Sequence, residues 1–148
     1  KKMKVFYTDF SKSLGFNYRN KKSLFVSRAI FVIIELSPKN IIRIRIPEGF
    51  ESDGCTLKLK ILWLLFGCPH NGKYIPASII HDYILDNPEL VCYNVNISSQ
   101  IFKQALLNEK VNIFTSNLMY LAVLIYQTLK KIFTKLKENI KCLIQNNF

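Results

Sequence analysis

The chain has 148 residues, of which 49% are hydrophobic and 21% are charged. This balance is typical of one folded domain with a real hydrophobic core, and it excludes an intrinsically disordered chain. The formal net charge is +11, and the longest apolar runs are far shorter than the roughly 20 residues of a membrane-spanning helix.

The positive charge lies at the two ends of the chain. Residues 1–22 carry a net charge of +6 and residues 130–148 a net charge of +4, whereas the middle is nearly neutral. Basic ends can contact nucleic acid, an anionic membrane surface or an acidic protein. They can equally be a solvated surface that keeps a hydrophobic protein in solution.

The N-terminal third predicts a small antiparallel sheet. Phe25–Leu36 is rich in β-branched and aromatic residues, and Ser37–Asn40 is a turn signal. Isoleucines then alternate with arginines over Ile42–Ile46, which is typical of a strand with one buried face. Pro47 and Gly49 end that strand.

The rest of the chain predicts helices. Leu57–Phe66 favours a short apolar helix or a buried turn, and Ile75–Leu85 a helix with Pro76 in its first turn. Ser98 or Ser99 is expected to cap a helix that reaches about Lys110. The inner face of that helix would consist of Ile101, Phe102, Ala105 and Leu106.

A long helix is expected to follow residues 112–116 and to reach about Ile144. Its first half has core-like positions at Leu118, Leu121, Ala122, Leu124 and Ile125. Its second half places apolar residues three and four apart with lysines between them, at Leu129, Ile132, Phe133, Leu136, Ile140 and Leu143. That apolar stripe can cover the chain's own sheet, bind a protein partner or lie on a membrane.

These patterns predict an α+β fold, with a small antiparallel sheet packed against three or four helices and a long basic helix at the end. We expect residues 1–126 to form a single α+β domain and residues 127–148 a basic helical extension. Four cysteines without a Cys-x-x-Cys pair predict reduced thiols in buried positions, at Cys55, Cys68, Cys92 and Cys142.

Asp53, His81 and Asp82 are the residues best suited to catalysis, because they are titratable groups in apolar surroundings. Asp53 lies in a glycine-containing turn, and it can orient His81 as a general base or a metal ligand if the turn folds against the helix. His81 and Asp82 are helix neighbours that should diverge by about 100° and not pair. Further side chains that can line such a site are Cys55, Thr56, Trp63, Tyr74 and Tyr83.

Other readings of these residues remain open. Asp53 can cap its own turn, and His81 can make a buried structural hydrogen bond. Cys55 can serve as a nucleophile with His81 as its base. Zinc ligands are available, but their spacing matches no common structural zinc site, at Cys68, His70, His81 and Cys92. The sequence therefore leaves metal content and cofactor unknown, and it contains neither a phosphate-binding glycine loop nor an RNA-binding aromatic motif.

The segment from Ile-Pro-Glu-Gly-Phe-Glu-Ser-Asp-Gly-Cys-Thr through Ile-Ile-His-Asp-Tyr to Leu-Met-Tyr-x-Ala-Val resembles the family named domain of unknown function 1353. The resemblance covers about residues 41–126. Matching positions are Pro47, Gly49, Phe50, Asp53, Gly54, Gly72, Tyr74, Ala77, His81, Asp82, Tyr83, Phe102, Met119, Tyr120, Ala122 and Val123. Cys55 and Thr56 replace the family's usual Ala-Ser, and Ser99 and Gln100 replace its Ala-Asp.

The resemblance implies a phage or prophage protein, found in the bacterial cytoplasm or a virion, since no secretory signal peptide is recognisable. We expect an accessory protein of uncharacterised activity, which can be a small hydrolase built on Asp53, His81 and Asp82. The alternative is a non-catalytic virion or tail-associated protein in which these residues hold the fold together. In either case we expect a protein partner at the basic C-terminal helix.

Overall fold

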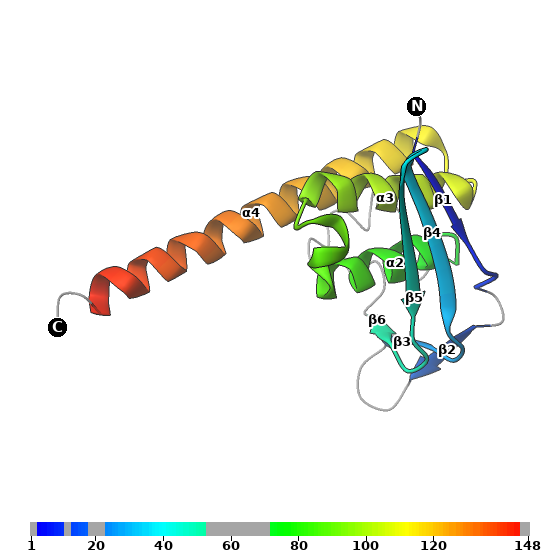
Figure 1. The fold of residues 1–148 in the computed structure, drawn as a ribbon, viewed down its shortest axis with the longest axis horizontal. Helices are drawn as coiled ribbons and strands as arrows, with labels where there is room; N and C mark the ends of the chain where they lie inside the picture. Colours follow the sequence, from blue (N-terminus) through cyan, green and yellow to red (C-terminus); the bar gives the residue numbers. More distant parts are fainter. Residues whose placement is uncertain (1–2, 11–12, 18–22, 53–71, 146–148) are drawn as a thin grey trace.

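The computed structural model describes residues 3–10, 13–17, 23–52 and 72–145 of the chain. Within the described ranges the strands come first and the helices follow (Figure 1). The strands are β1 (Lys4–Tyr7), β2 (Leu14–Asn17), β3 (Ser23–Val26), β4 (Ile30–Ser37), β5 (Asn40–Ile46) and β6 (Glu51–Ser52). The helices are α2 (Ile75–Asp86), the 3₁₀ helix η1 (Pro88–Val91), α3 (Val95–Asn108) and α4 (Ile113–Gln145).

The strands form two three-stranded antiparallel sheets, ordered β1-β4-β5 and β2-β3-β6. In the first sheet, alternate residues of β4 are buried, and β5 buries Ile44 and Ile46 while its arginines face solvent. This is the alternation that the sequence predicted. The α+β class and the long C-terminal helix are therefore confirmed, and the predicted Leu57–Phe66 element lies outside the described residues.

Two helices pack beside the first sheet and build the core with it. Pro76 sits in the first turn of α2, where its missing N–H costs no hydrogen bond. In α3 the predicted inner face is confirmed, since its four residues are at most 1% exposed. The end of α3 is tied to β1, because the side chain of Asn108 donates to the carbonyl of Val5.

The predicted cap of α3 was wrong. Asn94 caps the helix, and its side-chain oxygen accepts hydrogen bonds from the backbone N–H groups of Asn96 and Ile97. Ser98 and Ser99 lie within the first turns and donate their hydroxyls to the carbonyl of Val95. Asparagine and serine both suit a cap, so residue type alone did not separate Asn94 from Ser98 and Ser99, and the start of the helix was predicted one turn late.

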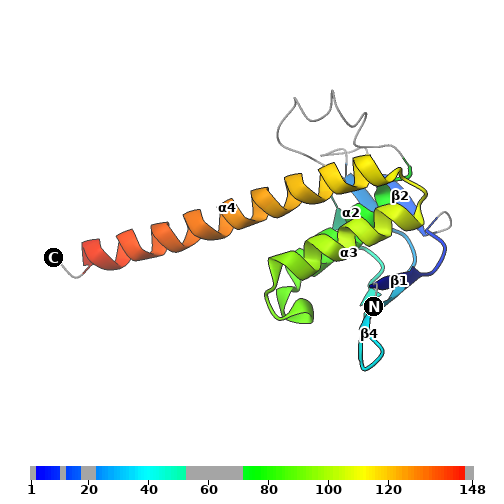
Figure 2. The same ribbon diagram turned by 90° about the horizontal axis from the view of Figure 1, so that it is seen from above.

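The long helix α4 lies alongside α3 and continues past the other elements, as Figures 1 and 2 show. Residue 126, the predicted domain boundary, lies inside this unbroken helix. Among the described residues, no helix combines the length and apolar character needed to cross a membrane.

The predicted core-like positions of α4 were only partly right: Leu118 packs against the core, but Leu121 and Ile125 do not. The buried residues of α4 are Ser116, Met119 and Gln127, whereas Leu121 is 47% exposed and Ile125 is 58% exposed. Residues two apart on a helix point about 200° apart, so Ile125 faces almost opposite to Gln127. Leu121 and Ile125 therefore face outward, whereas Ser116, Met119 and Gln127 face the body of the protein.

The cysteine prediction also needs a correction. Cys92 is exposed rather than buried, and it ends η1 in the left-handed region with φ of 50°. An exposed left-handed turn holds this residue outside the core, which composition alone does not reveal. Cys55 and Cys68 lie outside the described residues.

Candidate functional site

The imidazole of His81 is sealed in the core between three helices. Its residue is 7% exposed, and its ring lies 5.1 Å from the ring of Phe102 on α3. On the side of α4, its Nε2 lies 2.5 Å from the side-chain nitrogen of Gln127. Helix α2 places it there because the buried residues on either side of His81, Ile80 and Ile84, face the same core.

Asp82 points instead to the strand β6. Its Oδ2 accepts a hydrogen bond of 2.5 Å from the hydroxyl of Ser52. The side chain of Asp82 is about 25% exposed, so this carboxylate lies at the edge of the core. Asp53, which we expected beside His81, lies outside the described residues. The structure thus brings the two family segments together through Ser52 and Asp82.

The expectation that His81 and Asp82 do not pair needs a small correction. The Nδ1 of His81 and the Oδ1 of Asp82 are 3.9 Å apart. That distance is too long for a hydrogen bond, yet short enough for a Coulomb interaction if the imidazole is protonated. The side chains diverge as helix neighbours should, and the carboxylate still lies on the Nδ1 side of the ring.

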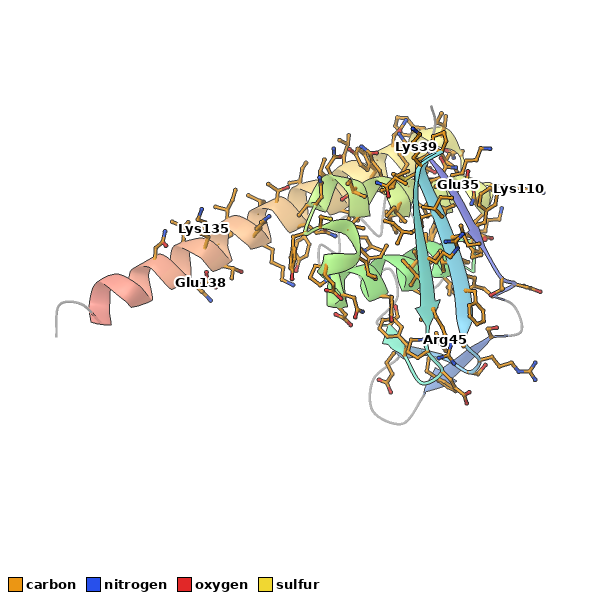
Figure 3. All side chains as sticks on the ribbon, viewed as in Figure 1. Glu35, Lys39, Arg45, Lys110, Lys135 and Glu138 are labelled. Atoms are coloured by element: carbon orange, nitrogen blue, oxygen red, sulfur yellow. The ribbon has the colours of Figure 1, made fainter. Side chains whose placement is uncertain are left out.

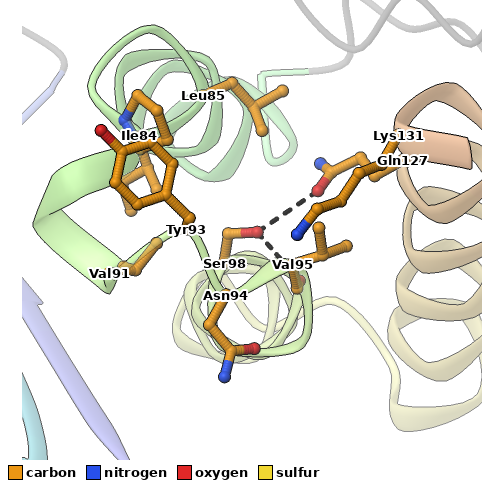
Figure 4. Close-up of a pocket in the computed structure, with 10 residues that line it drawn as sticks. Ile84, Leu85, Val91, Tyr93, Asn94, Val95, Ser98, Gln127 and Lys131 are labelled. Carbon is orange, nitrogen blue, oxygen red and sulfur yellow. Dashed lines mark hydrogen bonds between the residues drawn. The ribbon is translucent and has the colours of Figure 1, made fainter. Parts of the chain in front are cut away.

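A chain of polar groups continues from His81 to the start of α3. The Oε1 of Gln127 lies 3.3 Å from the hydroxyl of Ser98, which itself lies 2.9 Å from the carbonyl of Val95 (Figure 4). Among the described residues, no buried side-chain nitrogen or oxygen lacks a hydrogen-bond partner. Burying polar groups is costly unless they bond one another, so this set stabilises one packing of α2, α3 and α4.

The contact with Gln127 determines what His81 can do. An amide nitrogen only donates, so the Nε2 of His81 accepts, and the neutral imidazole then carries its proton on Nδ1. Nε2 is thus occupied by a buried donor, and Nδ1 faces Asp82. A general base or a metal ligand requires a ring nitrogen that is open to the substrate or the metal. Neither nitrogen of His81 is open in this way.

The other expected site residues divide into two groups. Tyr74 belongs to the buried core, and Tyr83 packs edge-to-face on Phe50 with ring centroids 5.2 Å apart. Outside the described residues lie Cys55, Thr56, Trp63, Cys68 and His70. Within the described part of the chain, no group of three or more His, Cys, Asp or Glu side chains is placed to hold a metal ion.

The pocket nearest to this polar chain opens between α2, α3 and α4, with a volume of about 250 Å³. Its walls are mainly apolar, and Figure 4 shows Gln127 and Ser98 at its polar end. A larger groove of about 520 Å³ shares Leu85, Val95 and Gln127 with it, and lysines of α4 line its outer side. His81 lies behind Gln127 and lines neither pocket.

A second polar cluster joins β1 to the end of α3. The hydroxyl of Tyr7 donates a hydrogen bond of 2.6 Å to the carboxylate of Glu109, beside a pocket of about 440 Å³. Burial raises the pKa of Tyr7 well above its ordinary value, and the hydrogen bond and the charge of Glu109 raise it further. A tyrosine held neutral can donate a hydrogen bond but is unsuited to act as a base.

Sequence reasoning missed Gln127, Ser98, Ser52 and the pair of Tyr7 with Glu109. For Gln127 a signal existed, because it shares a helix face with Ser116 and Met119. The contact of Tyr7 with Glu109 spans 102 residues and has no local signal.

Comparisons with known proteins give one match. A family model described as "Protein of unknown function (DUF1353)" matches residues 33–123. Neither the comparison with curated proteins nor that with solved structures gives a match. The matched segment runs from the middle of β4 into α4 and includes Ser52, His81 and Asp82.

Proposed function

The chain belongs to the DUF1353 family, and we propose that within it the chain is a phage- or prophage-type accessory protein that works by binding rather than by catalysis. In this proposal, the sheets and helices α2 and α3 form a rigid platform. The long helix α4 is the docking arm that the platform presents to a partner, in the bacterial cytoplasm or on the virion.

One observation carries this proposal: the best candidate catalytic group is sealed while a long apolar surface is open. His81 is 7% exposed and bonded to Gln127, whereas Phe133 of α4 is 62% exposed and Leu136 is 50% exposed. Contiguous exposed apolar surfaces on folded proteins mark interaction sites. A general base needs the opposite arrangement, with a free nitrogen at the wall of a pocket.

The test is complementation of a phage or prophage that lacks this gene. Ile132→Asp changes a residue that is already half exposed, so it should abolish phage production while the melting temperature stays within a few degrees. Asp82→Asn should retain phage production. The reverse result, with Asp82→Asn inactive but folded and Ile132→Asp active, would overturn the binding role.

A hydrolase remains the second candidate, and the contact of Asp82 with Ser52 favours it. This carboxylate is partly exposed, and it lies where the segment leading to Asp53 meets α2. A carboxylate at such an edge can act as a general acid or base. Hydrolysis of peptidoglycan by the wild type, lost in Asp82→Asn, would establish it. Neighbouring lysis genes would support the hydrolase, and neighbouring tail genes the binding role.

A further inference from the structure

The outer face of α4 carries a set of exposed apolar side chains, here named the outer stripe. Every member is at least 46% exposed: Phe114, Leu121, Ile125, Tyr126, Leu129, Ile132, Phe133 and Leu136. At a rise of 1.5 Å per residue, the outer stripe runs about 33 Å along the helix. The opposite face is occupied by the contact with α3 through Met119 and Gln127.

Lysines border the outer stripe on both sides. Lys130, Lys131, Lys135 and Lys137 are exposed, and each lies roughly 100–140° around the helix from Leu136. Figure 3 shows side chains of this part of α4, with Lys135 and Glu138 labelled, beyond the body of the molecule. Among the described residues of this segment, Glu138 is the one acidic side chain beside these four lysines, so the border is positively charged.

This distribution is that of a helix that lies flat on a membrane. Such helices bury an apolar arc at the level of the lipid headgroups, and their lysines reach from the flanks to the phosphates. Tyr126 and Phe133 lie at one edge of the outer stripe, and tyrosine is enriched at the membrane interface. The groove that Gln127 and Thr134 line lies on the other side of α4 and would stay in water.

A partner helix fits the same surface less well. If this part of α4 is written as a coiled-coil heptad (positions a to g), Leu129 and Leu136 fall at position a, and Ile125 and Ile132 fall at position d. The flanking e and g positions, which carry pairing charges in coiled coils, hold two aromatic residues, Thr128 and a single lysine. The remaining lysines are too far around the helix to pair across such a seam. A second copy would also bring two clusters of like charge together.

We propose that the outer stripe of α4 docks on an anionic phospholipid bilayer, with the helix parallel to the surface. This inference rests on the proposed function, because it names the surface that the docking arm binds. The apolar arc supplies the insertion and the flanking lysines supply the selectivity for anionic lipid.

Cosedimentation of the full chain with lipid vesicles tests the proposal. The protein should bind vesicles that contain phosphatidylglycerol, should bind phosphatidylcholine vesicles far more weakly, and should lose affinity as salt is raised. Ile132→Asp should weaken binding by about tenfold or more, because it places a carboxylate in the inserted arc. Thr134→Asp is the matched control, since it adds the same charge on the exposed groove side and should bind nearly as well.

Three results would overturn the proposal that the outer stripe binds an anionic bilayer. They are no binding of the folded wild type to phosphatidylglycerol vesicles, equal binding to both lipids, or equal loss in Ile132→Asp and Thr134→Asp. Sedimentation velocity over a range of protein concentrations would reveal a second copy as the occupant. If vesicles do not bind but Ile132→Asp still abolishes phage production, the docking arm stands and its partner is a protein.

Discussion

The Nε2 of His81 lies 2.5 Å from the side-chain nitrogen of Gln127, which is 46 residues further along the chain. Both residues are buried, with exposed fractions of 7% and 6%. The contact joins α2 to α4, and it removes from solvent the one histidine that the structure describes. A residue expected to act on a substrate is thereby tied into the fold.

Gln127→Leu should destabilise the protein by about 1–3 kcal/mol, because it leaves the buried Nε2 of His81 without a donor. His81→Phe should lower the free energy of unfolding by a similar amount, because it leaves the buried amide nitrogen of Gln127 without an acceptor. The double variant should lose less stability than the two single variants lose in total, with a coupling free energy of about 0.5–3 kcal/mol. Urea unfolding measures all three.

The control for this cycle is Gln100→Leu, at an exposed position of α3. Its effect should stay within about 0.5 kcal/mol, as for most surface substitutions. Strict additivity of Gln127→Leu and His81→Phe would show that the two side chains do not interact.

The tautomer of His81 is a second prediction. Because Gln127 presents its nitrogen to Nε2, the neutral imidazole should be protonated at Nδ1, on the side of Asp82. Long-range ¹H–¹⁵N correlation spectra distinguish the two ring nitrogens directly. The Nε2–H form would mean that Gln127 presents its oxygen, and Ser98 would then accept from the amide.

The stability of the protein should fall as pH rises above about 10, and Tyr7 should contribute to that fall. An unfolded tyrosine ionises near pH 10, whereas burial and Glu109 keep the folded Tyr7 protonated to higher pH. The folded state then binds a proton that the unfolded state has lost, so raising the pH favours unfolding.

Tyr7→Phe removes this contribution. Urea midpoints measured between about pH 8 and pH 11 should decline less steeply for Tyr7→Phe than for the wild type. At neutral pH the variant should be less stable by about 1–3 kcal/mol, because it loses a hydrogen bond to a carboxylate. Parallel declines for the two proteins would show that Tyr7 ionises equally in both states.

Burial predicts different outcomes for the same substitution at a leucine of α3 and a leucine of α4. Leu106→Ala should cost about 2–5 kcal/mol, because Leu106 is 0% exposed and its removal leaves a cavity. Leu129→Ala should change stability by less than about 1 kcal/mol, since Leu129 is 47% exposed. Chemical denaturation compares them, and a large loss for Leu129→Ala would mean that the outer stripe is covered in solution.

The local sequence pattern was sufficient to predict several features of the fold. The alternation over Ile42–Ile46 predicted a strand with one buried face, and the spacing in α3 predicted its buried residues. The helix predicted over Ile75–Leu85, from its apolar content and from Pro76 near its start, is observed over Ile75–Asp86. In each case the signal comes from residues within one or two turns of each other, where backbone geometry determines which side chains share a face.

The same periodicity showed that Ile125 and Leu129 share a face of α4, but it could not show where that face points. That choice depends on what α3 offers across the interface, where Ser98 lies within hydrogen-bond distance of Gln127. The candidate site had the same limit, since Ser52 and Asp82 are 30 residues apart. The sequence by itself therefore determined the elements and their apolar faces. Only the tertiary structure decided which faces meet, because contacts between distant residues depend on how the helices and strands pack together.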